Sequence, residues 1–183
     1  WVHKNPNVKG LRRVLHVMPD EISKTPTFRN NIKRLTGTGL TFDLCVSSRQ
    51  ISLTYDIVDY CPEVTFILDH CGVPDIKSGA FQNWSLRISE LAKRNNVFCK
   101  ISGIIAYGDP ATWTLDDIRP YFEHVLSTFG HKRIIWGSDS PVCNLGGNLE
   151  TWVAATRAFT SDWNKSDKEA FYWKTAYQIW DIK

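Results

Sequence analysis

Apolar and polar positions divide the chain into two kinds of short segment that alternate along its length. Five runs of five to seven residues are rich in Val, Ile, Leu and Phe and are bounded by Gly, Asn, Asp or Pro, which is typical of β-strands. The predicted strands are Leu11–Val17, Leu40–Val46, Val64–His70, Val97–Ser102 and Arg133–Gly137. Because segments of helical period separate these runs, the pattern predicts parallel strands joined by crossover helices.

The segments between and after the strands repeat apolar residues at the spacing of one helix face. The predicted helices are Phe28–Leu35, Gln50–Tyr60, Phe81–Lys93, Leu115–Phe129, Leu149–Thr160 and Ser166–Trp180. Thr114 is a good N-cap for the fourth helix, whose first turn carries the acids Asp116 and Asp117. Ser166 and Glu169 have the spacing of a capping box, which places the start of the last helix there.

Two α/β architectures fit this alternation, namely an open doubly wound sheet and part of a (β/α)8 barrel. An open nucleotide-binding sheet usually carries a glycine-rich phosphate loop, and neither GxGxxG nor GxxxxGK[ST] occurs in the chain. Polar residues inside the predicted strands favour the barrel. In Leu40–Val46, Phe42 and Leu44 alternate with Asp43, so we expect the apolar pair to face outer helices and Asp43 to face the interior.

Five strands are too few to close a barrel of eight. The chain opens on Trp1-Val2-His3, without an initiator Met, a signal peptide or a clear element start. We therefore expect the 183 residues to form one domain made of strands four to eight and their helices, with about 100 residues of barrel upstream.

The amino-acid composition argues against several classes of protein but does not by itself indicate a function. The net charge is only +3 and the basic residues are scattered, which does not predict a nucleic-acid surface. No apolar stretch approaches the roughly 18 to 20 residues of a membrane span. The five cysteines lack a CxxC pair, so neither a disulfide framework nor a thiolate zinc site is indicated. These features predict a soluble, cytoplasmic protein, and they leave a homo-oligomer open.

The most informative motif is Gly137-Ser138-Asp139-Ser140-Pro141, which directly follows an apolar strand. The carboxyl ends of parallel strands are where reactive groups of α/β proteins lie. Asp139 is therefore a candidate catalytic residue. The alternative is an Asp whose side chain caps the next turn.

Two further side chains are candidates for the same edge of the sheet. Alternation places His70 on the face of Val64–Leu68 that carries Phe66, and if that face is the interior, His70 could ligate a divalent metal or bond a substrate carbonyl. The alternative is a histidine that caps the strand and bonds a backbone group. Lys100 should also point into the barrel, to contact substrate or to form an ion pair.

Six stretches carry a resemblance to a known family, in family order and over most of the chain. They are Lys9–Val14, Leu40–Leu44, Leu68–Pro74, Cys99–Gly103, Trp113-Thr114 and Trp136–Val142. Together they resemble the amidohydrolase-related family (amidohydrolase family 2) of metal-dependent (β/α)8 hydrolases, and its sugar-lactonase branch in particular. The combination is specific, although each stretch alone is weak.

The resemblance implies hydrolysis of a cyclic ester, a sugar lactone or a related small acid, with Asp139 taking a proton from the attacking water. It implies one divalent metal ion, zinc first, held by His70 and Asp139. His70, the metal or Lys100 would stabilise the developing oxyanion. Some relatives work without a metal and use arginines to clamp an acidic substrate, a part that Arg12 and Arg13 would take.

Other residues bear on the pocket or depart from the family pattern. Trp113, in the loop after the seventh strand, would roof the pocket.

The His-x-His of the first strand has no counterpart, in agreement with a missing N-terminal part. His16-Val17-Met18-Pro19-Asp20 stands where lactonase relatives tend to read Gln-x-Glu-Pro-Asp. Met18 thus replaces a carboxylate, and a thioether is a poor ligand for a hard ion, although His16 could compensate.

Two other functions stay open on the sequence. The superfamily also contains decarboxylases and amide hydrolases, which the fold cannot separate from lactonases. A non-catalytic half-barrel or fragment that acts through a partner chain is the second alternative, because its sheet edges would be open to pairing.

Overall fold

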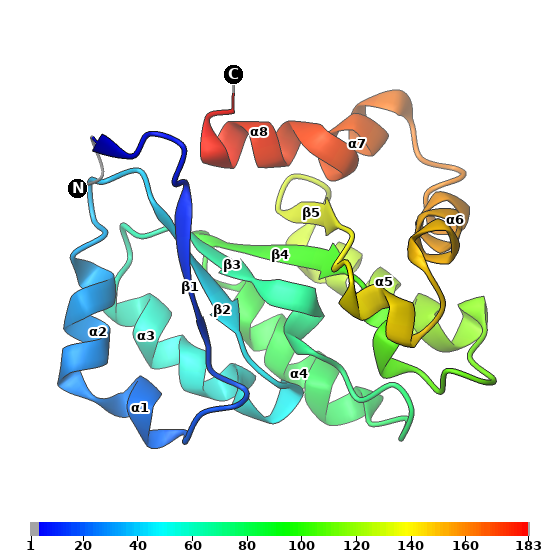
Figure 1. The fold of residues 1–183 in the computed structure, drawn as a ribbon, viewed down its shortest axis with the longest axis horizontal. Helices are drawn as coiled ribbons and strands as arrows, with labels where there is room; N and C mark the ends of the chain where they lie inside the picture. Colours follow the sequence, from blue (N-terminus) through cyan, green and yellow to red (C-terminus); the bar gives the residue numbers. More distant parts are fainter. Residues whose placement is uncertain (1–3, 183) are drawn as a thin grey trace.

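The computed structural model describes residues 4–182, in which one parallel sheet runs in the order β1-β2-β3-β4-β5 (Figure 1). Its strands are β1 (Gly10–Val14), β2 (Thr41–Cys45), β3 (Phe66–Leu68), β4 (Val97–Ser102) and β5 (Ile134–Gly137). All five predicted strands are present. A doubly wound sheet reverses its strand order at a switch point, so this unbroken order is that of a barrel wall.

The first strand is shorter than the predicted Leu11–Val17. The amides of Leu15 and His16 both donate to the carbonyl of Cys45, at 2.9 and 3.2 Å, and Met18 N closes a turn on the carbonyl of Leu15. The chain therefore leaves the sheet after Val14, and His16 lies in the loop that follows.

Helical segments follow each strand. They are α1 (Glu21–Lys24), α2 (Pro26–Lys33), η2 (Ser48–Thr54), α3 (Tyr55–Tyr60), η3 (Asp69–Gly72), α4 (Phe81–Ala92), η4 (Ile104–Tyr107), α5 (Leu115–Phe129), η5 (Val142–Leu145), α6 (Leu149–Phe159), α7 (Lys165–Glu169), η6 (Ala170–Lys174) and α8 (Thr175–Trp180). The predicted Leu115–Phe129 is confirmed, and Asp117 accepts hydrogen bonds from both the amide and the hydroxyl of Thr114. The predicted capping box at Ser166 is wrong, because the N-cap of α7 is Asn164, two residues earlier, whose side chain accepts from Asp167 N.

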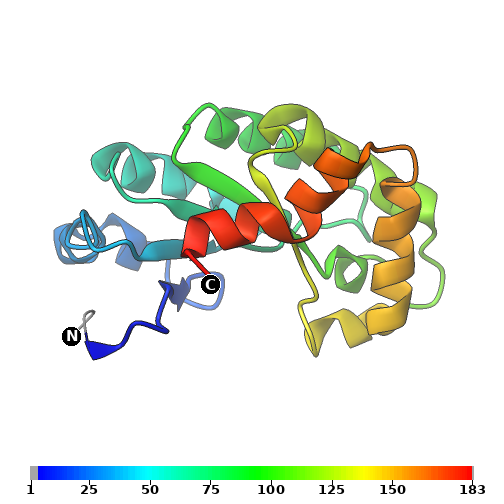
Figure 2. The ribbon, with the colours of Figure 1, turned by 90° about the horizontal axis from the view of Figure 1, so that it is seen from above.

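The helices α2 to α5 cover one face of the sheet, which we call the outer face (Figure 2). Phe42, Leu44, Phe66 and Leu68 belong to the buried core between this face and the helices. The expected outward direction of Phe42 and Leu44 is thereby confirmed. No helix in the described part of the chain combines the length and apolarity needed to cross a membrane.

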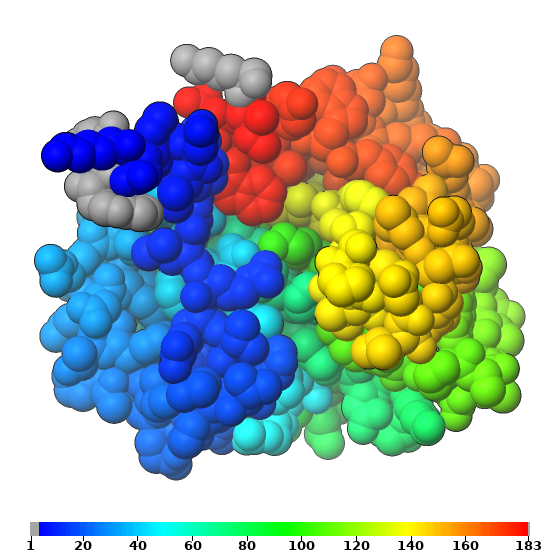
Figure 3. All heavy atoms as spheres, viewed as in Figure 1, coloured from blue at the N-terminus to red at the C-terminus, as the bar shows by residue number. Residues whose placement is uncertain are grey.

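The opposite, inner face is crossed at the amino ends of the strands by the C-terminal helix α8 (Figures 1 and 2). Trp180 Nε1 donates to Thr41 Oγ1 at 3.1 Å, and Lys100 Nζ lies 5.8 Å from the centroid of the same indole. Beyond this helix the surface is hollowed between the segment of β1 and the segment that follows β5 (Figure 3). The inner face is therefore closed at one end and open toward the carboxyl ends of the strands.

Candidate active site

An open depression of about 900 Å³ lies at the carboxyl ends of the strands. It is lined by His16, Ser47, Ser48, Arg49, Val73, Pro74, Asp75, Lys77, Ala106, Tyr107, Gly108, Pro110 and Leu145. Loops after β1, β2, β3, β4 and β5 all contribute to this lining. In barrel enzymes this edge carries the active site, so the depression is the candidate substrate site.

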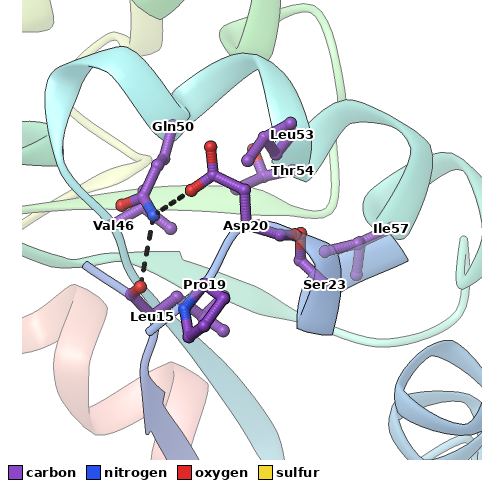
Figure 4. Close-up of a pocket in the computed structure, with 9 residues that line it drawn as sticks. All are labelled: Leu15, Pro19, Asp20, Ser23, Val46, Gln50, Leu53, Thr54 and Ile57. Carbon is purple, nitrogen blue, oxygen red and sulfur yellow. Dashed lines mark hydrogen bonds between the residues drawn. The ribbon is translucent and has the colours of Figure 1, made fainter. Parts of the chain in front are cut away.

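The loop that carries His16 is held by a buried amide. Gln50 Nε2 donates to the carbonyl of Leu15 at 3.2 Å and to Asp20 Oδ1 at 2.7 Å, which joins the loop after β1 to η2 across a small pocket (Figure 4). His16 Nδ1 lies 3.5 Å from Cys45 Sγ at the end of β2. The structure thus brings the predicted His16 to the rim of the site.

Two acids and two bases form an ion-pair network on the inner face. Arg12 contacts Asp43 Oδ2 through Nη2 at 3.1 Å and Asp69 Oδ2 through Nε at 2.9 Å. Lys100 Nζ lies 2.7 Å from Asp69 Oδ1 and 3.3 Å from Asp43 Oδ2. The side chain of Asp69 is fully buried, and such a carboxylate is tolerated only when cations pair with it. Arg12 and Lys100 therefore both belong to the site, each committed to carboxylates.

Arg13 is not part of this network. Neighbouring residues of a strand point to opposite faces, and Arg13 pairs in register with the outward-facing Leu44. Its Nη2 lies 3.5 Å from Met18 Sδ. The structure thus separates the two arginines that the sequence could not distinguish.

His70 reaches the inner face by a turn of the backbone rather than by alternation. Phe66 and Leu68 face the helix-covered core, so a continued strand would have pointed His70 there as well. Instead β3 ends at Leu68, and His70 takes the left-handed conformation with φ of 51°. Its Nδ1 then lies 2.8 Å from Ser102 Oγ and 3.3 Å from Asp139 Oδ2.

Asp139 is also held in a left-handed conformation, with φ of 54°. A Cβ added to Gly103 would lie 2.4 Å from the Cβ of Asp139, so the close approach of these two loops requires glycine there. The turn after Asp139 is closed by its backbone carbonyl, which accepts from Cys143 N at 2.9 Å. The carboxylate is thus directed toward His70. Positive φ at such residues costs of order 1–3 kcal/mol each and concentrates at functional sites.

Burial sets the charge states of this pair. It lowers the pKa of His70 to about 4, with help from the nearby positive charges of Lys100 and Arg12. It raises the pKa of Asp139 to about 6, with a further contribution from the negative charge of Asp69. At neutral pH the imidazole is therefore uncharged, while Asp139 is mostly ionised and able to accept a proton.

Several residues of the site were not singled out by the sequence. Ser102 is the hydrogen-bond partner of His70, Asp69 joins Lys100 to Arg12, and Tyr107 lines the depression. Burial raises the pKa of Tyr107 above its usual value, with the charge of Asp139 as the next cause. The sequence signal that could have indicated Asp69 as a site residue is its position directly after the strand β3.

Trp113 lies beside the depression and outside the residues that line it. Its indole Nε1 donates to the carbonyl of Gly146 at 2.6 Å, which ties the loop after β4 to the loop after β5. The ring also packs against the hydrophobic core. A role as a roof over bound substrate stays a prediction.

The inner-face residues fit a metal ion of the zinc type. Cys45, Asp69 and His70 offer ligand atoms that all lie within 4.8 Å of one another. Oδ2 of Asp69 and Oδ2 of Asp139 are buried and lack a well-aligned hydrogen bond, although Arg12 and His70 lie near them. Sulfur, nitrogen and carboxylate donors are those that zinc accepts.

Comparison with known proteins identifies the family of the chain. The amidohydrolase family model (Amidohydro_2) matches residues 3–182. The chain belongs to the amidohydrolase family. An L-fucono-1,5-lactonase of Burkholderia ambifaria is 32% identical over 82% of the chain and 52% of its own length. A Sinorhizobium fredii protein designated y4mH is 30% identical over 96% of the chain and 62% of its own length.

Solved amidohydrolase structures share the fold. A crystal structure of an amidohydrolase from Burkholderia multivorans with bound zinc superposes with a TM-score of 0.91 and 23% identity, over 96% of the chain and 65% of that structure. The five strands and their helices thus correspond to part of a barrel, as predicted. The chain spans about half to two thirds of the length of the curated relatives it matches.

Proposed function

We propose that the protein hydrolyses an uncharged sugar lactone, with Asp139 as the general base. The observation that carries this proposal is the close pair of Asp139 and His70 at the carboxyl ends of β5 and β3, 3.3 Å apart beside an open depression. The similarity to an L-fucono-1,5-lactonase supports the reaction class.

In this reaction Asp139 takes a proton from a water molecule, and the resulting hydroxide attacks the lactone carbonyl carbon. The ring C–O bond then breaks, and the proton held by Asp139 passes to the leaving ring oxygen. A carboxylate with a pKa of about 6 is ionised at neutral pH and still basic enough to accept the proton. Ser102 fixes the ring of His70 through Nδ1. With hydrogen on Nδ1, Nε2 keeps a lone pair that can accept a hydrogen bond.

The charge balance favours a substrate without a carboxylate. Asp43, Asp69 and Asp139 outnumber the two cations among them, Arg12 and Lys100, so this cluster is net negative while His70 is neutral. A dianionic lactone would meet repulsion there as long as the site holds no metal ion.

The arginine and lysine side chains that line the depression are also neutralised. Arg49 pairs with Asp20 at 2.6 Å, and Lys77 pairs with Asp109 at 3.3 Å. Neither cation is held ready for a carboxylate of the substrate. The polar groups around the depression therefore suit the hydroxyl groups of a sugar better than an acidic substrate.

A metal ion fits the same place. His70 and Asp139, with Cys45 and Asp69 beside them, would hold it, and when bound it would polarise the carbonyl and acidify a bound water. The roles of Asp139 as proton acceptor and of Ser102 in orienting His70 belong to the chain itself and do not require the metal ion.

The experiment compares the turnover of a panel of lactones by the wild-type protein and by Asp139→Asn. Turnover is measured as the rate at which acid is released. The panel contains five- and six-membered sugar lactones and, for comparison, lactones that carry carboxylates. We expect hydrolysis of the uncharged members and a loss of about 10²- to 10⁴-fold in Asp139→Asn.

Asp116→Asn is the matched control, because Asp116 is 92% exposed on α5, away from the depression, and its loss should leave turnover unchanged. Undiminished turnover in Asp139→Asn would sink the assignment of the base. Preference for the carboxylated lactones would overturn the substrate class.

A further inference from the structure

Cys45 is set apart from the buried cysteines of the core. Cys61, Cys71 and Cys99 belong to the hydrophobic core cluster, whereas Cys45 and the buried Cys143 lie outside it, Cys45 at the carboxyl end of β2. It occupies the inner face, two residues after Asp43, and is only 3% exposed. Its neighbour is an imidazole, since His16 Nδ1 lies 3.5 Å from Sγ.

The thiol faces two other metal-binding groups. Ligand atoms of Cys45, Asp69 and His70 all lie within 4.8 Å of one another. Tetrahedral zinc with sulfur, nitrogen and oxygen donors holds its ligand atoms roughly 3.3 to 3.6 Å apart, so small side-chain rotations would close the set. Asp69 is a fully buried carboxylate between these groups. Its Oδ2 lies 2.9 Å from Arg12 Nε but accepts no well-aligned hydrogen bond.

The charges around the thiol also balance with an ion present. Three carboxylates and two cations leave the inner-face cluster with one net negative charge. Loss of the thiol proton adds a second negative charge, and one divalent cation then brings the cluster to neutrality.

We propose that Cys45 is a thiolate ligand of the zinc-type divalent ion that His70 and Asp139 would hold, with Asp69 as a further oxygen donor. On binding, the Sγ–H bond breaks and its proton passes to water, while Sγ donates an electron pair to the metal, without oxidation or reduction. The proposal concerns the site for which lactone hydrolysis is proposed, but binding itself is what tests it.

The test is Co²⁺ titration of the chelator-treated protein, read as the sulfur-to-cobalt charge-transfer band in the near ultraviolet. We expect the band in the wild type, its loss in Cys45→Ser, and its retention in Cys61→Ser, which removes a buried thiol of the core. A band that survives in Cys45→Ser, or no band in the wild type, overturns the proposal.

A second measurement needs no variant and therefore does not depend on the folding of Cys45→Ser. Zinc-edge X-ray absorption of the zinc-loaded wild type should show one sulfur at about 2.3 Å, and a first shell of nitrogen and oxygen alone contradicts the proposal. Lactone turnover is recorded on the same samples. A sulfur ligand in a protein that hydrolyses no lactone would support this site and remove the proposed function instead.

Discussion

The two faces of the sheet are made from the same strands and have opposite chemistry. The outer face carries side chains such as Phe66 and Leu68, which are fully buried under helices. The inner face carries Arg12, Asp43 and Lys100, which reach one another through ion pairs across β1, β2 and β4. Alternation along each strand produces both environments from one segment of sequence.

The comparison shows where stability and chemistry reside. Apolar burial on the outer face is non-directional and accumulates with area, so it stabilises the fold wherever it occurs. The inner face holds charges whose desolvation is offset only by their partners. The outer face should therefore respond to lost volume, and the inner face to lost charge.

The largest loss of stability is expected from Phe66→Ala on the outer face. Phe66 is fully buried between β2, β4 and the helices, and truncating such a residue costs about 3–5 kcal/mol through lost transfer free energy and a cavity. Urea denaturation measures this loss. Leu86→Ala is the control, because Leu86 is 68% exposed on α4 and should change stability little. A loss below about 1 kcal/mol for Phe66→Ala would contradict the assigned core.

Asp69→Asn tests the inner face, where volume is kept and charge is lost. The substitution leaves Lys100 and Arg12 short of their shared partner, and breaking a buried ion pair costs about 3 kcal/mol. The double variant Asp69→Asn with Lys100→Met should recover part of this loss, because no buried ammonium is then left unpaired. Equal stability of the single variant and the wild type would show that the network does not depend on Asp69.

The pH dependence separates activity from stability. Activity should fall about tenfold per pH unit below pH 6, because protonation removes the base Asp139, whose pKa is about 6. Burial raises this pKa most, the charge of Asp69 raises it further, and the charges of Arg12 and Lys100 lower it, so substitution of these three residues should move it. The acid limb of kcat/KM measures it. A limb at the ordinary aspartate pKa near 4 would contradict the burial of Asp139.

Stability should change little over the same range, because the two site groups act in opposite directions. Asp139 has a raised pKa, so its contribution to stability decreases as pH rises from about 4 to 6. His70 has a pKa lowered to about 4, so its contribution increases as pH rises from about 4 to its unfolded value of about 6.5. Denaturation midpoints at these pH values, in the wild type and in His70→Gln, measure how far the two contributions cancel. The variant should lose stability as pH rises, because only the contribution of Asp139 is left.

The smallest effect is expected at the closed end of the inner face. Trp180→Phe removes the hydrogen bond from the indole to Thr41 Oγ1 and should cost about 1 kcal/mol. Thr41→Val removes the same bond from the other side. A double-mutant cycle should give a coupling energy of similar size, and additive losses would show that α8 is not held by this contact.

The local sequence pattern was sufficient to predict the secondary-structure elements and, in β2, which side chains face outward and which face inward. The five strands, the helix Leu115–Phe129 and the inward position of Asp43 follow from periodicity, because apolar alternation and helical spacing are properties of neighbouring residues. The position of Asp139 after a strand followed in the same way. The amidohydrolase resemblance, carried by short motifs, is confirmed by the match over residues 3–182.

Only the tertiary structure decided which side chains meet. His70 faces Asp139 because its backbone turns left-handed, which residue alternation does not reveal. Arg12 rather than Arg13 joins the network because of strand register. Cys45 reaches Asp69 and His70 only when β2 and β3 pair, since these contacts join residues more than twenty positions apart. Sequence pattern describes each strand separately, and the chemistry of this protein arises between strands.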